Sequence, residues 1–241
     1  MDLRRGARPV VRIGHRGAPG VAAENTLESL EAAIELGVDA VEIDVARGVR
    51  GTAVLSHERG RRVPAGAVPL DDALDWLAER DAAVQLDLKD RGLEPVVAEA
   101  VRRHGLLGRA YVSTPRFASL RAVAALDPSL GRALTIPDDR LHLSRHRVAR
   151  PVVEPSLAVL RRLLPHRLPR LLRSALADAA TLDVRLVTAD AIRACHETGA
   201  AVYVWTVDDA ALAHSLVEAG ADGIITNDPR IFEGFRGFPT T

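Results

Sequence analysis

The stretch VVRIGHRGAPGVAAENTLESLEAAIELGVDAVEIDV, residues 10–45, contains the signals of a strand, a helix and a second strand. Residues 10–14 are a short apolar run, which predicts a strand. Residues 26–36 carry apolar side chains at helical spacing, with Thr26 as the expected N-cap. Residues 40–45 then predict another strand. We therefore expect a β–α–β unit with two parallel strands.

The same alternation continues almost to the end of the chain. Further strands are expected at residues 84–88, 110–112, 133–136, 201–207 and 223–226, and helices at residues 70–79, 94–103, 116–125, 189–197 and 208–219. Alternation on this scale indicates a parallel sheet, and units of roughly 30 residues fit a (β/α)8 TIM barrel better than an open sheet. The sequence has no Gly-x-Gly-x-x-Gly or Walker-type loop. We expect an α/β fold with one barrel domain over residues 1–241.

The composition excludes several classes of protein. Thirty-two basic and 32 acidic residues cancel, so no overall positive field indicates a nucleic-acid partner. The single cysteine, Cys195, rules out an internal disulfide and is expected to be a buried thiol on a helix. Residues 1–9 lack the apolar segment of a signal peptide, and no apolar stretch reaches the ~18 residues of a membrane span. We expect a cytoplasmic protein without a transmembrane segment, and the composition points to no particular oligomeric state.

Residues 136–183 depart from the regular alternation. Nine arginines lie in this segment: Arg140, Arg145, Arg147, Arg150, Arg161, Arg162, Arg167, Arg170 and Arg173. Its leucines keep helical spacing, but Pro165 and Pro169 are expected to divide them between two helices. The arginines could form an anion-attracting or membrane-surface face. The interpretation we favour is a solvated outer face of a helix.

Charged residues alternate with apolar ones in two of the expected strands. In VEIDV, Glu42 and Asp44 share one face, because residues two apart in a strand point to the same side. In VQLDLK, the shared face carries Gln85, Asp87 and Lys89. Charges on the strands of a parallel barrel are costly unless they are paired, hydrated or bound to a metal. Lys89 and the carboxylates could simply neutralise one another, but barrel active sites lie at the carboxyl ends of strands, which favours a functional site.

The three carboxylates offer ligands for a metal ion. Glu42, Asp44 and Asp87 provide hard oxygen ligands, which suit Mg²⁺ or Ca²⁺ better than zinc. We expect one divalent cation, Mg²⁺ or Ca²⁺, with water or substrate phosphate oxygens completing its shell. Lys89 beside them would hold a phosphate oxygen and reduce the repulsion among the carboxylates.

Two of the eight histidines follow apolar runs that lead to this same edge, namely His15 and His57. An imidazole has an ordinary pKa near ~6.5, so both of its protonation states are accessible. Two imidazoles on opposite sides of a phosphodiester can therefore form a general acid–base pair. Arg16 would offset charge that develops on the phosphoryl oxygens. The pattern therefore indicates acid–base chemistry on a bound phosphodiester.

These motifs also follow one another in an order that is similar to a known family. Gly14-His15-Arg16-Gly17, Glu24-Asn25-Thr26, Glu42-Ile43-Asp44-Val45, His57 and Leu86-Asp87-Leu88-Lys89 resemble the signature of the glycerophosphodiester phosphodiesterase family. VYVWTV at residues 202–207 and GADGIITN at residues 220–227 are similar to that family's closing strands. The similarity extends over about residues 11–229 and is weak in the middle third.

The resemblance implies a TIM barrel that hydrolyses glycerophosphodiesters to sn-glycerol 3-phosphate and an alcohol, an activity of lipid and glycerol metabolism. By this similarity His15 and His57 would be the acid and the base. Members of the family can use the glycerol 2-hydroxyl as an internal nucleophile, which passes through a cyclic phosphate. The substrate would be a small molecule.

The resemblance also implies roles for the remaining site residues. Arg16 and Lys89 would grip the phosphate, and the three carboxylates would hold the divalent cation. Glu24 would orient the corner that carries the first histidine. Trp205 and Tyr203 would pack over the glycerol or the leaving group.

Several positions depart from the family pattern. Asp87 stands where the family usually has glutamate, so we expect it to bind the cation through water or to shift it. Glu58 after His57 replaces an aspartate, and Ala23 replaces a proline. The segment from His57 to Asp87 is too short for the inserted subdomain typical of the family. We expect a compact member with an open mouth and an altered or broader choice of substrate.

Two other functions compete with this interpretation. A lysophospholipase D or sphingomyelinase D-like activity on single-chain phospholipids would suit the missing insertion and the arginine-rich segment, but we expect neither a signal peptide nor an anchoring helix. A non-catalytic barrel that binds phosphate ligands is the alternative of a different class. Binding alone would not require both His15 and His57, which counts against it.

Overall fold

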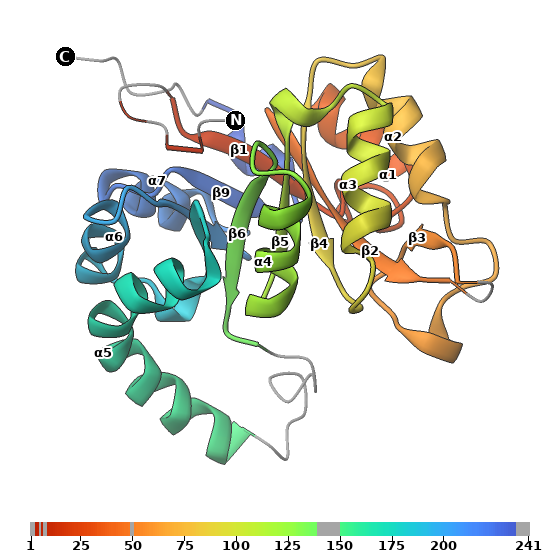
Figure 1. The fold of residues 1–241 in the computed structure, drawn as a ribbon. Coiled ribbons are helices and arrows are strands. Elements are labelled where there is room, and N and C mark those ends of the chain that lie inside the picture. The colour runs from red at the N-terminus through yellow and green to blue at the C-terminus, as the bar shows by residue number, and fades with distance from the viewer. Residues whose placement is uncertain (1–2, 5, 7–8, 49–50, 139–149, 235–241) are drawn as a thin grey trace.

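Eight parallel strands form a closed barrel with helices around it (Figure 1) in the computed structural model, which describes residues 3–4, 6, 9–48, 51–138 and 150–234. The barrel strands are β1 (Val11–His15), β2 (Ala40–Arg47), β4 (Ala83–Leu88), β5 (Ala110–Thr114), β6 (Gly131–Ile136), β7 (Ala179–Asp183), β8 (Ala201–Trp205) and β9 (Gly223–Thr226). The helices are α1 (Leu27–Glu35), α2 (Leu70–Ala78), α3 (Glu94–Arg103), α4 (Phe117–Leu126), α5 (Arg150–Ala175), α6 (Ala189–His196) and α7 (Ala210–Glu218). The predicted (β/α)8 barrel is confirmed.

Pairing between β1 and β2 closes the barrel. β1 pairs with β9 on one side and with β2 on the other, and the register places His15 beside Glu42. β2 pairs in parallel with β4, which places Asp44 beside Asp87. The short strand β3 (Ala53–Leu55) pairs antiparallel with the end of β2 and leads the chain to His57. Four segments, namely β1, β2, β4 and the residues after β3, thus deliver predicted site residues to one edge of the barrel.

Apolar side chains pack on both sides of the barrel wall, outside against the helices and inside the barrel. The larger core lies between the strands and the helices and includes the fully buried Ile43, Leu86 and Leu168. The floor of the barrel interior contains Tyr111 and Tyr203, whose ring centroids lie 5.4 Å apart. Small residues share this floor: Ala40, Ala133, Ala179 and Ala201. Alternating large and small side chains fill the interior, so the polar residues at its carboxyl end stand on a packed base.

The turn after β1 is too tight for side chains at two of its positions. A Cβ atom on Gly14 would lie 2.4 Å from the backbone oxygen of Gly17. Gly17 has a φ of 87°, and a Cβ there would lie 2.5 Å from Ser29 of α1. Between them Arg16 has a φ of 54°, a conformation that costs a non-glycine residue about 1–2 kcal/mol. The turn packs His15 and Arg16 closely against the start of α1.

The arginine-rich segment forms one long helix. α5 spans Arg150–Ala175 and contains Pro165 and Pro169, so the predicted division into two helices is wrong. The ribbon of α5 bends along its length (Figure 1), which accommodates proline rings without ending the helix. Leu164 and Leu168 are fully buried against the barrel. This packing compensates for the backbone hydrogen bonds that prolines cannot make.

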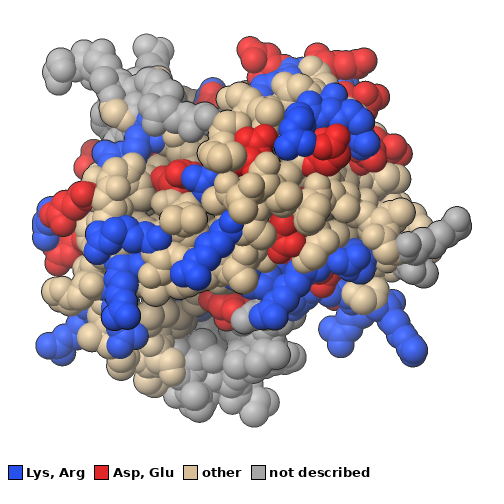
Figure 2. Space-filling view, viewed as in Figure 1, with Lys and Arg blue, Asp and Glu red and all other residues tan. Residues whose placement is uncertain are grey.

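The outer face of α5 carries the arginines. Those with described side chains are all exposed: Arg161, Arg162, Arg167, Arg170 and Arg173. Basic side chains project from this side of the molecule in the space-filling view (Figure 2). The predicted solvated helix face is confirmed for these five. Arg140, Arg145, Arg147, His142 and His146 lie outside the described residues, as does the side chain of Arg150.

β7 was not expected from the sequence. Its residues, AATLD, include two alanines, which have low strand propensity. All five residues are buried, because both faces of a barrel strand are covered. Between β3 and α2 the chain forms one short 3-10 turn at Gly60–Arg62. Within the described part of the chain, no helix is both long and apolar enough to cross a membrane.

Candidate active site

A cavity opens at the carboxyl end of the barrel, where the predicted site residues meet. Seven of the ten expected residues line it: His15, Arg16, Glu42, His57, Asp87, Lys89 and Trp205. Asp44 and Glu24 contact lining residues from behind. The rest of the wall includes residues that sequence reasoning did not select: Arg116, Thr135, Thr181, Asp183 and Arg185.

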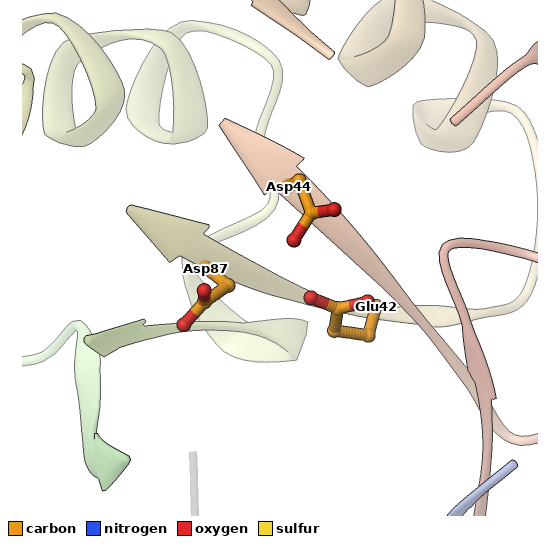
Figure 3. A group of neighbouring side chains, drawn as sticks. All are labelled: Glu42, Asp44 and Asp87. Atoms are coloured by element: carbon orange, nitrogen blue, oxygen red, sulfur yellow. The ribbon is translucent and has the colours of Figure 1, made fainter. Parts of the chain in front are cut away.

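Three carboxylates from two adjacent strands face one another. Glu42 and Asp44 extend from β2, and Asp87 extends from β4 (Figure 3). Ligand oxygens from the three lie within 4.8 Å of one another, and all three residues are buried. A buried set of carboxylate oxygens this close together is the donor set that Mg²⁺ and Ca²⁺ prefer. The structure therefore contains a candidate acidic metal site.

Asp44 is surrounded by donors. Its carboxylate lies 2.5 Å from Lys89 Nζ and 3.0 Å from Arg16 Nε, and it accepts a 3.0 Å hydrogen bond from Asn25 Nδ2. Burial alone would raise the pKa of Asp44, but the charges of Lys89 and Arg16 outweigh burial and hold that pKa well below its ordinary value. Asp44 is therefore ionised at neutral pH.

Glu42 behaves in the opposite way. Its Oε2 accepts a 2.9 Å hydrogen bond from the backbone N–H of Arg16 and lies 3.9 Å from His15 Nε2. Burial raises the pKa of Glu42 well above its ordinary value, and the negative charge of Asp44 raises it further. The protein by itself therefore disfavours the charged form of Glu42. A divalent cation at this site would favour its ionised form.

Lys89 bridges two of the carboxylates. Its Nζ lies 2.5 Å from both Asp44 Oδ1 and Asp87 Oδ2. Burial lowers the pKa of Lys89, but the carboxylates raise it above its ordinary value, so the ammonium stays charged. On its other side, Asp87 Oδ1 accepts a 2.7 Å hydrogen bond from Ser113 Oγ, which accepts one of 2.9 Å from Gln85 Nε2. The short side chain of Asp87 is thereby fixed from both sides.

Arg16 connects the turn after β1 to the carboxylates. Its Nη1 donates a 2.7 Å hydrogen bond to Glu24 Oε2, while its Nε faces Asp44 and its backbone N–H faces Glu42. Burial lowers the pKa of Arg16, but the acidic neighbours raise it above its ordinary value. The guanidinium is therefore a permanent positive charge at the cavity wall. Glu24 lies where the sequence placed it, beside this corner.

His57 lies beside the ionised Asp44. Its Nδ1 is 3.3 Å from Asp44 Oδ2. The backbone N–H of Ser56 donates a 2.9 Å hydrogen bond to the backbone oxygen of Asp44, which attaches this segment to β2. The carboxylate can orient the imidazole and leave Nε2 as the ring nitrogen available for proton transfer.

His15 ends β1 and has a different environment. Its Nδ1 lies 2.7 Å from Asn227 Oδ1. Burial, together with the charge of Arg16, lowers the pKa of His15 to about 4, although Asp44 and the hydrogen bond to Asn227 oppose the shift. His15 is therefore neutral at neutral pH, and one of its ring nitrogens can accept a proton.

The sequence matches the model of a known protein family. The model of the glycerophosphoryl diester phosphodiesterase family matches residues 15–76 and 79–231. The chain belongs to this family. The match covers the two histidines, the carboxylates and both closing strands, so the resemblance drawn from the motifs is confirmed. The chain is thus a phosphodiesterase of the glycerophosphodiester class.

Several relatives and solved structures are similar to this chain over nearly their full length. The glycerophosphodiester phosphodiesterase of Caldanaerobacter subterraneus is 23% identical, over 90% of this chain and 93% of the relative. A phosphodiesterase structure from Oleispira antarctica, solved with the product sn-glycerol-3-phosphate, has a TM-score of 0.72 at 20% identity, with 94% of this chain and 96% of that chain covered. The glycerophosphodiester phosphodiesterase structure from Agrobacterium tumefaciens has a TM-score of 0.69 at 19% identity, with 93% and 99% covered. At these identities the solved structures demonstrate the shared fold.

The two aromatic residues that the family resemblance assigned to the substrate lie at different depths. Trp205 lines the cavity, and its Nε1 donates a 3.2 Å hydrogen bond to the backbone oxygen of Thr181. Tyr203 is 1% exposed, packs on Tyr111 and donates a 2.9 Å hydrogen bond from its hydroxyl to the backbone oxygen of Leu3. The expectation that Tyr203 contacts the substrate is corrected, because Tyr203 belongs to the floor of the barrel.

Sequence reasoning missed several residues of this phosphodiesterase site. Asn25 and Asn227 belong to quoted motifs, but neither was given a role, although each fixes a predicted site residue. Thr181 and Asp183 lie on β7, the strand that was not expected. Their signal was weak because the polar residues of β7 follow alanines instead of a β-branched apolar run.

Proposed function

We propose that this chain hydrolyses glycerophosphodiesters to sn-glycerol 3-phosphate and an alcohol, with one divalent cation, Mg²⁺ or Ca²⁺. The proposal is carried by the meeting of His15 and His57 with three buried carboxylates at one cavity. Hydrolysis of a phosphodiester needs proton transfers on two oxygens and stabilisation of charge at one phosphorus. The family and the product bound in the Oleispira antarctica structure support the same reaction.

Glu42, Asp44 and Asp87 would hold the cation. Their oxygens are hard ligands within 4.8 Å of one another. Burial and repulsion from Asp44 raise the pKa of Glu42, and a cation would offset both effects. When bound, the cation stabilises charge on the phosphoryl oxygens. The short side chain of Asp87 is held by the hydrogen bond from Ser113, so Asp87 would bind the cation through water or shift its position.

The two histidines would divide the proton transfers. Neutral His15 takes the proton of the attacking hydroxyl, which belongs either to water or to the glycerol 2-hydroxyl. The new phosphorus–oxygen bond forms as the bond to the leaving alcohol breaks, and His57 protonates the departing oxygen. With the glycerol hydroxyl as nucleophile, the first product is a cyclic phosphate, which a second attack by water opens.

The remaining residues would bind and orient the substrate. Arg16 and Lys89 hold the phosphoryl oxygens, since both are charged and face the cavity. Glu24 keeps Arg16 in place through their 2.7 Å contact. Trp205 covers the glycerol or the leaving group. A location in the cytoplasm stays a prediction from the sequence.

Product release tests this function. Glycerophosphocholine, glycerophosphoethanolamine and lysophosphatidylcholine are each incubated with Mg²⁺, with Ca²⁺ or with EDTA. The product measured is glycerol 3-phosphate for the first two and lysophosphatidic acid for the third. We expect turnover of the first two with a metal and none with EDTA. Turnover of lysophosphatidylcholine alone would favour a lysophospholipase D activity, and binding without turnover would favour a non-catalytic barrel.

Matched histidine variants test the acid–base assignment. His15→Ala and His57→Ala are each expected to lower kcat by about 10²–10⁴-fold. His166→Ala removes an exposed imidazole from α5 and is expected to leave kcat unchanged. Full activity in His57→Ala would contradict the assignment.

A further inference from the structure

A chain of hydrogen bonds runs behind His15. Asn227, directly after β9, places Oδ1 2.7 Å from His15 Nδ1. The other end of the same amide, Nδ2, donates a 2.7 Å hydrogen bond to Oδ2 of Asp208, which follows β8. β1, β9 and β8 are consecutive in the barrel, so their carboxyl ends bring these three residues together.

Asp208 is itself held in one orientation. Its Oδ1 accepts hydrogen bonds from the backbone N–H of Asn227 at 2.8 Å and from Thr226 Oγ1 at 3.1 Å. Its Oδ2 therefore faces the side chain of Asn227. A carboxylate accepts hydrogen bonds and donates none, so the group of Asn227 that faces Asp208 is the NH2 group.

This orientation determines which ring nitrogen of His15 carries the proton. With the NH2 group of Asn227 on Asp208, the carbonyl oxygen of the amide faces His15. A carbonyl oxygen only accepts, and two acceptors 2.7 Å apart would repel each other, so His15 Nδ1 carries the hydrogen. The lone pair of the neutral ring then lies on Nε2, on the side of Glu42 and the cavity.

We propose that Asp208 and Asn227 are positioning residues that hold His15 in the Nδ1–H tautomer and keep Nε2 ready to accept a proton. Neither residue is among those that line the cavity, so both act through His15. The part of the proposal that concerns proton transfer rests on the proposed function; the tautomer does not. In serine proteases, replacing the carboxylate that binds the catalytic histidine lowers kcat strongly because the histidine then adopts the wrong tautomer.

Nitrogen NMR of the full chain reads the tautomer directly. The ¹⁵N signals of His15, assigned by their loss in His15→Gln, are recorded near neutral pH without substrate. We expect Nδ1–H in the wild type. In Asp208→Asn the side chain at position 208 can donate hydrogen bonds as well as accept them. The amide of Asn227 can then take either orientation, so we expect the ¹⁵N signals of His15 to shift toward those of the Nε2–H form. Wild-type signals of the Nε2–H form would overturn the proposal.

A swap of the two side chains provides the sharpest variant. In the double variant Asp208→Asn with Asn227→Asp, a carboxylate faces His15 Nδ1 directly and an amide supports it from behind. We expect this swap to restore the Nδ1–H signals that Asp208→Asn weakens. Asp209→Asn makes the same substitution one residue along and keeps an N-cap on α7, so it is the control that should leave the signals unchanged.

Kinetics of the same variants test the link to catalysis. Asp208→Asn is expected to lower kcat by about tenfold or more with KM changed by less than about threefold, since Asp208 does not line the cavity. The swap is expected to recover most of the loss, and Asp209→Asn to behave as the wild type. Unchanged kcat and unchanged signals in Asp208→Asn would overturn the positioning role. A wild type that holds Nδ1–H but hydrolyses no phosphodiester would support the tautomer assignment and overturn the proposed reaction.

Discussion

Replacing Asp44 with asparagine removes the charge at the centre of the site. Asp44 is fully buried, and its carboxylate lies 2.5 Å from Lys89, 3.0 Å from Arg16 and 3.3 Å from His57. Asn25 Nδ2 donates a fourth contact at 3.0 Å. Asp44→Asn keeps the shape of the side chain but leaves the buried Arg16 and the half-buried Lys89 without the carboxylate between them.

The expected loss of stability is large. Removing one partner of a buried ion pair costs about 3–5 kcal/mol, out of a total free energy of unfolding of about 5–15 kcal/mol for a typical domain. Urea unfolding followed by circular dichroism, without added metal, measures the loss. The matched control is Asp190→Asn, whose ion pair with Arg193 has side chains 65% and 66% exposed and is worth at most about 1 kcal/mol. A loss in Asp44→Asn no larger than in the control would refute the reasoning.

The same substitution has a predicted pH dependence. The folded pKa of Asp44 lies below its unfolded value of about 3.9, so its ionised form contributes stability above that pH. The contribution is lost as the pH falls through the folded pKa. The difference in unfolding free energy between wild type and Asp44→Asn should be constant at neutral pH and shrink only below about pH 4. A difference that grows in acid would contradict this sign.

Three further results are expected. Gly14→Ala should lower stability by about 1–3 kcal/mol, since the added Cβ would lie 2.4 Å from the oxygen of Gly17. Gly108→Ala is the control, because its added Cβ meets nothing within 4 Å. Equal urea midpoints for the two variants would argue against a tight turn. Cys195 should react with a thiol reagent only after unfolding, because it is buried and burial raises its pKa to about 12; rapid labelling of the folded chain would contradict this. Trp205→Ala should raise KM for glycerophosphocholine, and an unchanged KM would remove Trp205 from the substrate site.

Periodicity predicted most of the fold because each barrel strand and its helix form a local unit. The strand at residues 223–226 and the helix at residues 94–103 have the predicted bounds. β7 was missed because burial on both faces makes its alanines acceptable, although their intrinsic strand propensity is low. α5 was divided because a proline in an isolated helix is disruptive, whereas packing of Leu164 and Leu168 maintains this helix.

The site was predictable where a side chain's direction follows from its strand. The alternation in β2 correctly placed Glu42 and Asp44 on the inner face beside Asp87. Alternation does not give depth along the strand, and Tyr203, which the family resemblance assigned to the substrate, lies in the floor of the barrel. The contact between Asp208 and Asn227 depends on how the ends of β8 and β9 meet, which local sequence does not specify.

The identity of the phosphorus-containing product tests the proposed reaction most directly. ³¹P NMR of glycerophosphocholine with the wild-type chain and Mg²⁺ or Ca²⁺ should show the diester signal replaced by that of glycerol 3-phosphate, with no conversion in EDTA and strongly reduced conversion in His57→Ala. Appearance of phosphocholine in place of glycerol 3-phosphate, or equal conversion in EDTA, would contradict a metal-dependent attack that expels the choline alcohol from this cavity.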